Sequence, residues 1–134
     1  MSAKCFLDSN IIIYAHTDLD LQKQQIAQQI ISNEESIVST QVLQETANSL
    51  FRKFEFPWAD IQPVLSEIAN NNLLHTNTAV TVADACRIAA RYGFSFYDSL
   101  IIAAALEANA ELLYSEDLQD GQVIDGALTI KTPF

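Results

Sequence analysis

Short apolar runs alternate along this chain with longer stretches whose apolar residues recur at helical spacing. The runs are KCFLD, SIVS, LLHT, ELLYS and LTIKT, at residues 4–8, 36–39, 73–76, 111–115 and 128–132. Apolar runs of this length, without clean two-residue alternation, are typical of buried strands. Strands separated by helices favour an α/β fold, in which helices flank a short, mainly parallel sheet of four to five strands.

The stretches between these runs are predicted to be helices, and SNIIIYAHT after the first run is predicted to be a turn or a short helix. The predicted helices cover 21–32 with Asp20 as cap, 40–54 with Thr40 as cap, Pro57 to about Asn70, 79–92 and 95–110. Pro63 should kink or divide the third helix, and Gly93 should end the fourth. The last helix is apolar nearly all round, so we expect it to be central and buried.

Size and composition predict one compact domain covering 1–134. The chain has 134 residues, is 49% hydrophobic and contains only three glycines and three prolines, so no linker is visible. It has no apolar leader and no run long enough to cross a bilayer, which predicts a cytoplasmic location. Cys5 and Cys86 are expected to be buried and reduced.

The charge balance is strongly acidic. Seventeen Asp and Glu residues face seven Lys and Arg residues, a formal net charge of −10. This argues against indiscriminate adhesion to nucleic acid or to an anionic membrane. A polyanionic substrate would therefore need a local explanation: acids gathered where a divalent metal binds, or a basic partner.

Two carboxylates lie where binding sites form in parallel sheets, at the carboxyl ends of strands. Asp8 ends the first predicted strand, and Asp117 lies just past the fourth. Each also has a purely structural interpretation. Asp8 followed by Ser-Asn is good turn chemistry, and Asp117 stands in an acidic stretch, EDLQDGQVIDG, that we expect to be a polar surface loop.

Asp98 and Glu45 are two further candidates. Ser95 and Asp98 are spaced as a capping box, yet the aromatic residues of FSFYDSL predict a partly buried carboxylate. In the helix at 40–54 an apolar stripe, Leu43, Ala47, Leu50, Phe51 and Phe54, should pack inward. By helical phase Glu45 points away from that stripe and in line with the polar residues Gln41, Asn48 and Arg52. That polar strip is either a solvated face or one wall of a cleft.

Several carboxylates converging on one place would repel one another unless divalent cations held them, and hard oxygen ligands suit Mg²⁺ or Mn²⁺. Taken together, FLDSN, Glu45 within its helix, FSFYDSLIIAAAL and LLYSEDLQDGQ resemble the PIN domain, and most closely the VapC-type toxin ribonucleases of prokaryotes. The resemblance covers essentially the whole chain.

This resemblance implies a PIN-like three-layer fold and an endoribonuclease that hydrolyses RNA with metal-activated water. It assigns one or two Mg²⁺ or Mn²⁺ ions to four acids, Asp8, Glu45, Asp98 and Asp117. Asn10 and Ser115 match small polar positions that support those acids, and Asp120 is an extra acid that could assist Asp117. The resemblance also implies a cognate antitoxin, a homodimer and an RNA substrate, for which Arg52, Arg87 and Arg91 are candidate contacts unless they merely solvate helix ends.

Other interpretations remain open. A PIN-like module without catalytic activity could serve in RNA binding or protein interaction. A metal-free ribonuclease would have to use both histidines, His16 and His75. A haloacid-dehalogenase-type phosphatase needs a second Asp where Asn10 stands, and a receiver domain needs a late sheet lysine, for which only Lys131 in the terminal strand is available.

Overall fold

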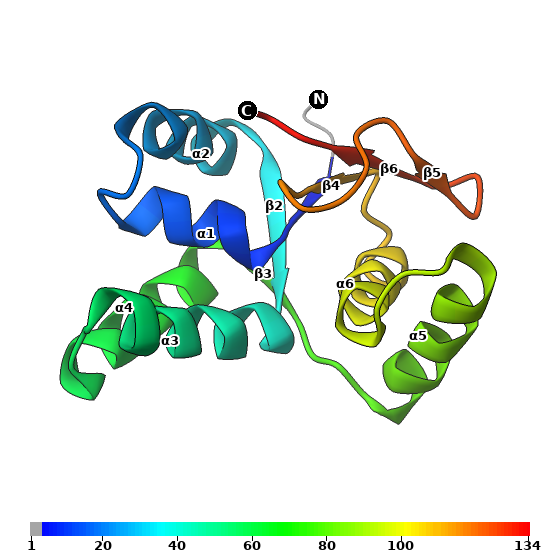
Figure 1. Cartoon of the computed structure of the whole chain (residues 1–134), viewed down its shortest axis with the longest axis horizontal. Helices are drawn as coiled ribbons and strands as arrows, with labels where there is room; N and C mark the ends of the chain where they lie inside the picture. The colour runs from blue at the N-terminus through cyan, green and yellow to red at the C-terminus, as the bar shows by residue number, and fades with distance from the viewer. Residues whose placement is uncertain (1–3) are drawn as a thin grey trace.

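The computed structural model describes residues 4–134 and shows a central sheet of six strands (Figure 1). The strands are β1 (Lys4–Leu7), β2 (Glu35–Ser39), β3 (Leu73–His75), β4 (Leu112–Tyr114), β5 (Val123–Ile124) and β6 (Leu128–Lys131). Their order is β3-β2-β1-β4-β6-β5, and every pair is parallel except β5 with β6. The α/β fold with a mainly parallel sheet is therefore confirmed.

Among residues 4–134, six helices flank the sheet: α1 (Ser9–His16), α2 (Leu21–Asn33), α3 (Thr40–Phe54), α4 (Trp58–Asn71), α5 (Ala79–Tyr92) and α6 (Phe96–Glu107). In Figure 1, α1 to α4 gather on one side of the molecule and α5 with α6 on the other. The first strand in sequence lies inside the sheet, because β1 pairs with both β2 and β4. No helix within residues 4–134 combines the length and the apolar character needed to cross a membrane.

Local signals set the helix ends. The Asp20 side chain accepts hydrogen bonds from two backbone N–H groups of α2, which confirms its capping role. Helix α3 is capped by Ser39, whose hydroxyl accepts from the N–H of Val42, and not by Thr40 as predicted from the sequence. Gly93 ends α5 with a φ of 79°, a conformation that glycine adopts without strain.

Pro63 does not divide the helix that contains it. Helix α4 runs without interruption from Trp58 to Asn71, so of the two expected effects, a kink or a division, the division does not occur. The missing N–H of Pro63 would have bonded to the carbonyl of Ala59, and both residues are exposed. Water can therefore satisfy the carbonyl, and the loss of one helical hydrogen bond is tolerated.

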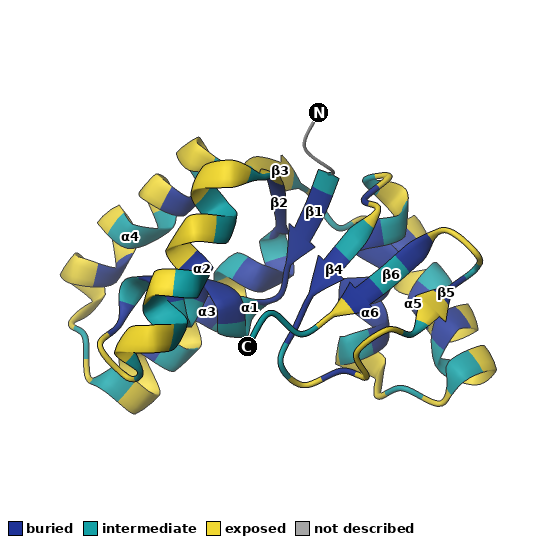
Figure 2. Cartoon of the chain, turned by 90° about the horizontal axis from the view of Figure 1, so that it is seen from above, coloured by how far each residue is buried: buried dark blue, intermediate teal, exposed yellow. Residues whose placement is uncertain are grey.

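Of the two helices α5 and α6, α6 is the more deeply buried. All of its residues from Ser99 to Ala105 are buried, as its all-round apolar character predicted (Figure 2). Its alanines let α5 approach closely, and Ala103 packs with Leu100 and with Ala85 of α5. The position of α6 under the sheet fixes its first turn, which carries Asp98.

Three further expectations from the sequence are wrong. Phe51 is 43% exposed and stacks on Trp58, with ring centroids 4.2 Å apart, whereas the stripe of α3 was expected to bury it. Cys5 is buried but Cys86 is exposed, because Cys86 lies on the outer face of α5. The stretch expected to be a polar loop also contains β5, which makes six strands where four to five were expected.

Candidate functional site

Asp8 is a buried carboxylate at the carboxyl end of the central strand β1. It is 6% exposed, and its side chain accepts a 2.7 Å hydrogen bond from the N–H of Ser9 at the start of α1. The pKa of Asp8 is raised to about 6, mainly by burial and in smaller part by the negative charges of Glu45 and Asp98, while hydrogen bonds from Ser115 and Ser9 act in the opposite direction. The charged side chains that act on Asp8 are therefore both acidic.

Ser115 links Asp8 to Asp117. It follows β4, whose end meets the end of β1 in the parallel pairing. The Ser115 hydroxyl donates a 2.8 Å hydrogen bond to Oδ2 of Asp8 and accepts one of 3.2 Å from the N–H of Asp117. Because one hydroxyl joins the two residues, Asp8 and Asp117 belong to the same small region despite their distance along the chain.

Asn10 holds the other side of Asp117. Its Nδ2 donates to Oδ2 of Asp117 at 3.1 Å, and its Oδ1 accepts from the N–H of Glu116 at 3.3 Å. The first turn of α1 is thus tied to the loop after β4. The two residues expected to support the acids, Asn10 and Ser115, both contact them.

Gln41 connects the helix that carries Glu45 to the helix that carries Asp98. Its Nε2 donates to Oε2 of Glu45 at 3.3 Å and to the carbonyl oxygen of Tyr97 at 3.1 Å. Gln41 is only 4% exposed, and its Oε1 has no hydrogen-bond partner among the residues of the described structure. A buried amide arranged in this way holds the Glu45 carboxylate against the start of α6.

Asp98 lies in the first turn of α6 and is half-buried. Its N–H donates to the Ser95 hydroxyl at 3.2 Å, so the capping spacing was correctly interpreted. The partly buried setting expected for Asp98 is therefore confirmed. The neighbouring aromatic residues are themselves exposed, Phe96 at 39% and Tyr97 at 66%.

The four candidate acids are connected pairwise but do not form a closed cluster. Asp8 and Asp117 are both hydrogen-bonded to the Ser115 hydroxyl, and Glu45 accepts a hydrogen bond from Gln41. The negative charges of Glu45 and Asp98 raise the pKa of Asp8. Within residues 4–134, no three side chains of His, Cys, Asp or Glu come together as a metal-binding group. The chemistry of the donors nevertheless fits a hard divalent cation, because all are carboxylate oxygens and the buried Asp8 has only acids acting on its charge.

The two other acids of the loop after β4 have partners of their own. Glu116 forms a 2.8 Å ion pair with Lys23 and accepts a hydrogen bond from the Tyr14 hydroxyl. Asp120 accepts a 2.8 Å hydrogen bond from the N–H of Thr132 and so holds the segment after β6. Both acids therefore fasten the loop to its surroundings.

Two of the three arginines expected to contact RNA are already paired. Arg87 binds Asp84 and Asp125, each at 2.7 Å, and Arg91 binds Asp125 at 3.1 Å. The contacts with Asp125 connect α5 to the turn between β5 and β6, whereas the pair with Asp84 lies within α5. Arg52 is exposed, its Nε donates to Asn48 at 3.1 Å, and it forms no ion pair with any residue between 4 and 134.

The histidines serve separate parts of the fold. His75 lies 3.1 Å from Glu107, and Nδ1 of His16 lies 2.9 Å from the carbonyl oxygen of Ile12. Neither is hydrogen-bonded to the other or to the candidate acids. This arrangement gives no support to a mechanism that uses two histidines.

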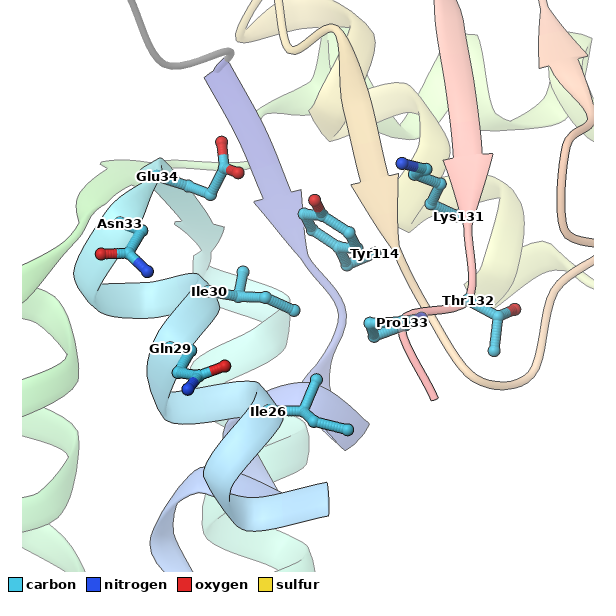
Figure 3. A pocket seen from close by; sticks show the side chains of 9 residues that line it. All are labelled: Ile26, Gln29, Ile30, Asn33, Glu34, Tyr114, Lys131, Thr132 and Pro133. Atoms are coloured by element: carbon cyan, nitrogen blue, oxygen red, sulfur yellow. The ribbon is translucent and has the colours of Figure 1, made fainter. Parts of the chain in front are cut away.

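Two of the several hollows on the surface of residues 4–134 differ in their relation to the candidate acids. One, of about 430 Å³, lies between α2 and the strands β4 and β6, where Ile26, Ile30 and Tyr114 line it (Figure 3). It contains none of the four candidate acids. The other, of about 300 Å³, lies beside Glu45 and is lined by Gln41, Gln44, Glu45, Asn48 and Tyr97.

The chain matches one family model and has the same fold as several solved structures. A model of the PIN domain matches residues 5–119. The solved structures with a similar fold include VapC20 of Mycobacterium tuberculosis, described as a Sarcin-Ricin loop cleaving toxin. It has a TM-score of 0.69 and 18% identity, and the match covers 84% of this chain and 89% of that one.

Two further similar structures are complexes. A toxin-antitoxin complex from Klebsiella pneumoniae matches with a TM-score of 0.70 and 18% identity, covering 97% of this chain and 98% of that one. VapBC2 from Rickettsia felis, bound to a DNA fragment from its promoter, matches with a TM-score of 0.69 and 17% identity, covering 96% and 98%. No curated protein sequence matches the chain.

Proposed function

This chain belongs to the PIN-domain family, and we propose that it is a metal-dependent endoribonuclease, the toxin of a type II toxin-antitoxin pair. PIN nucleases generally use divalent metal ions. The observation that carries the proposal is the environment of Asp8, a carboxylate only 6% exposed, bound to Ser115 and acted on by the charges of Glu45 and Asp98. Burying a charge in this way is costly unless something compensates it.

Mg²⁺ or Mn²⁺, as one or two ions, would be held by Asp8, Glu45, Asp98 and Asp117. The chemistry that such a cation supplies in a nuclease is activation of water and stabilisation of negative charge on the phosphate. Ser115 and Asn10 orient the carboxylates of Asp8 and Asp117 through hydrogen bonds. Asp120 plays no part in this proposal, because it is hydrogen-bonded to Thr132.

An antitoxin partner is proposed from the similar structures and from charge. One of those structures is a toxin-antitoxin complex, and another is a VapBC pair bound to promoter DNA. The net charge of −10 would suit a basic segment of a partner that covers the acids. We further propose that the toxin acts in the cytoplasm as a single-domain protein that forms a homodimer.

Incubation of the purified protein, freed of any partner, with total RNA and Mn²⁺ tests the proposal. We expect discrete fragments, and we expect the Asp8→Ala variant to produce none of them. Mapping the fragment ends would identify the cleavage site. Cutting by the wild type at the level of Asp8→Ala would refute the nuclease assignment.

One observation favours a second candidate, a catalytically inactive PIN-like module for RNA binding or protein interaction. It is the lack, within residues 4–134, of a closed group of three metal-binding side chains. A metal titration separates the two functions. In the nuclease, Mn²⁺ should raise the melting temperature of the wild type and leave Asp98→Asn unchanged, whereas an inactive module should not respond in either form.

A further inference from the structure

The hollow beside Glu45 lies where the first turns of α3 and α6 meet. Gln41 closes its floor, because it is buried and hydrogen-bonded to both Glu45 and the backbone of Tyr97. The volume of about 300 Å³ is at the lower end of the range for small-ligand pockets. The hollow is therefore large enough for one flat group, immediately next to a proposed catalytic acid.

An aromatic ring forms one side of this hollow. Tyr97 is 66% exposed, although it directly precedes Asp98. A single exposed aromatic residue is ordinary on a protein surface, so exposure alone indicates nothing. Beside a phosphodiester-cleaving site, however, an exposed aromatic face is what unpaired bases stack on.

Amide side chains also line the hollow. Gln44 is exposed and lies one helical position before Glu45. The Oδ1 of Asn48 accepts a hydrogen bond from Arg52, so the Nδ2 of Asn48 is left to donate elsewhere. Amides carry both donors and acceptors, and they can therefore pair with the edge of a nucleobase.

A cation follows along the same face of α3. Arg52 is seven residues after Glu45, which at 1.5 Å per residue is roughly 10 Å along the helix axis. Arg52 is exposed and has no acidic partner among the described residues, so it is free to contact a backbone phosphate. This face of α3 thus carries the acid Glu45, then the amides Gln44 and Asn48 beside Tyr97. The cation Arg52 follows further along the helix.

We propose that this hollow binds one unpaired nucleobase next to the cleaved phosphate of a single-stranded RNA. Tyr97 stacks on the base, and Gln44 with Asn48 binds its edge. This inference rests on the proposed ribonuclease function and adds a base-binding subsite to it. Tyr97, Gln44 and Asn48 would then contribute to the choice of cleavage sequence.

The test uses two short RNAs that contain the mapped cleavage site, one intact and one with an abasic nucleotide beside the cleaved bond. We expect the abasic change to lower kcat/KM of the wild type by roughly tenfold or more, since stacking of one base contributes at this level. Tyr97→Ala should lower kcat/KM on the intact RNA similarly and be insensitive to the abasic change. Tyr97→Phe should behave as the wild type.

Trp58→Ala is the matched control, because Trp58 is 58% exposed but lies at the start of α4, away from the hollow. It should retain the full abasic effect. Should Tyr97→Ala fail to fold, Gln44→Ala at an exposed helical position serves in its place. Its abasic penalty should be smaller than that of the wild type but not absent, because Tyr97 still stacks on the base, and an unchanged penalty would refute the contact of Gln44 with the base.

The outcomes separate this inference from the proposed function. If the wild type cleaves RNA but Tyr97→Ala keeps the full abasic penalty, the base lies elsewhere and only the subsite is refuted. If the abasic change does not affect the wild type, the subsite is likewise refuted. If the wild type does not cut RNA at all, the ribonuclease assignment and the subsite are both overturned.

Discussion

The hydroxyl of Ser115 donates a 2.8 Å hydrogen bond to Oδ2 of Asp8, across 107 positions of the chain. This bond lowers the pKa of Asp8 and opposes the larger effect of burial, and the pKa that results from all influences together is about 6. Ser115 therefore helps to keep Asp8 ionised near neutral pH, the state in which a carboxylate can bind a cation.

Replacing Ser115 by Ala should move the acidic limb of the pH profile for RNA cleavage upward. A hydrogen bond to a charged group contributes about 1.5–3 kcal/mol, which corresponds to a shift of about one to two pH units. The measurement is kcat/KM against pH. Ser99→Ala is the control, because the Ser99 hydroxyl is buried without a partner in the described structure, and its profile should not move. Superimposable profiles for Ser115→Ala and the wild type would contradict the role of Ser115.

Replacing Asp8 by Asn should make the metal-free protein more stable above pH 6. The pKa of Asp8 is raised from 3.8 to about 6 on folding, so the folded state binds this proton more tightly than the unfolded state does. Ionised Asp8 therefore lowers the free energy of unfolding. This loss is absent below pH 3.8, grows as the pH rises from 3.8 to 6, and is complete above pH 6, where it is on the order of 3 kcal/mol. Urea unfolding with chelator at pH 4.5 and 7.5 measures it. The stability gained by Asp8→Asn should be larger at pH 7.5, and an equal gain at both values would argue against a raised pKa.

Manganese binding should weaken as the pH falls below 6. The cation and the proton compete for Asp8, so affinity should decrease by about tenfold for each pH unit below the pKa of about 6. Isothermal titration calorimetry at pH 7.5 and 5.0 measures this. Affinity that does not change over this range would show that Asp8 is not a ligand.

Replacing Gln41 by Leu should strongly reduce the rate of RNA cleavage and change the free energy of unfolding only a little. The substitution removes the hydrogen bonds to Glu45 and Tyr97, but it also removes the buried Oε1 that has no partner in the described structure. We expect a fall in kcat of about tenfold or more, with a change in unfolding free energy within about 1 kcal/mol. Thr46→Val on the same helix is the control, since the Thr46 hydroxyl is also buried without a partner, and it should retain activity. Full activity in Gln41→Leu would show that Glu45 needs no positioning.

Replacing Arg87 by Ala should lower stability without impairing RNA cleavage. Arg87 binds two acids, Asp84 and Asp125, whereas Arg91 binds Asp125 alone. These pairs are solvent-exposed, so we expect a loss of up to about 1 kcal/mol for Arg87→Ala and less for Arg91→Ala. Arg52→Ala should instead weaken RNA binding at unchanged stability. RNA binding that falls in Arg87→Ala and not in Arg52→Ala would reverse this assignment.

The sequence could predict the order of elements because the signals for them are local. Asp20 and Gly93 mark helix ends by side-chain and backbone chemistry that needs no tertiary context. The proximity of Asp8 and Asp117 also follows from the sequence, since parallel strands end at the same edge of the sheet. The resemblance then supplied Asn10 and Ser115, whose contacts with the acids the structure shows.

Other features depend on packing between distant segments. Asp125, the partner that Arg87 and Arg91 share, comes from a turn 38 and 34 residues later. The exposure of Tyr97 depends on how α6 meets α3. Strand β5 is a different case. The Asp125–Gly126 pair that follows it, with φ of 52° and 67°, is a hairpin signal in the sequence, but two residues are too few to show a period.

The central place of β1 also has a consequence for biosynthesis. Its neighbour β4 and the hydroxyl of Ser115 are translated more than a hundred residues after Asp8, as the separation of 107 positions requires. A nascent chain therefore keeps the edge of β1 open and the acids apart until the ribosome has passed Asp117. In the proposed ribonuclease, the four acids therefore come together only late in translation, and the proposed antitoxin, if already present in the cell, could bind as the fold closes.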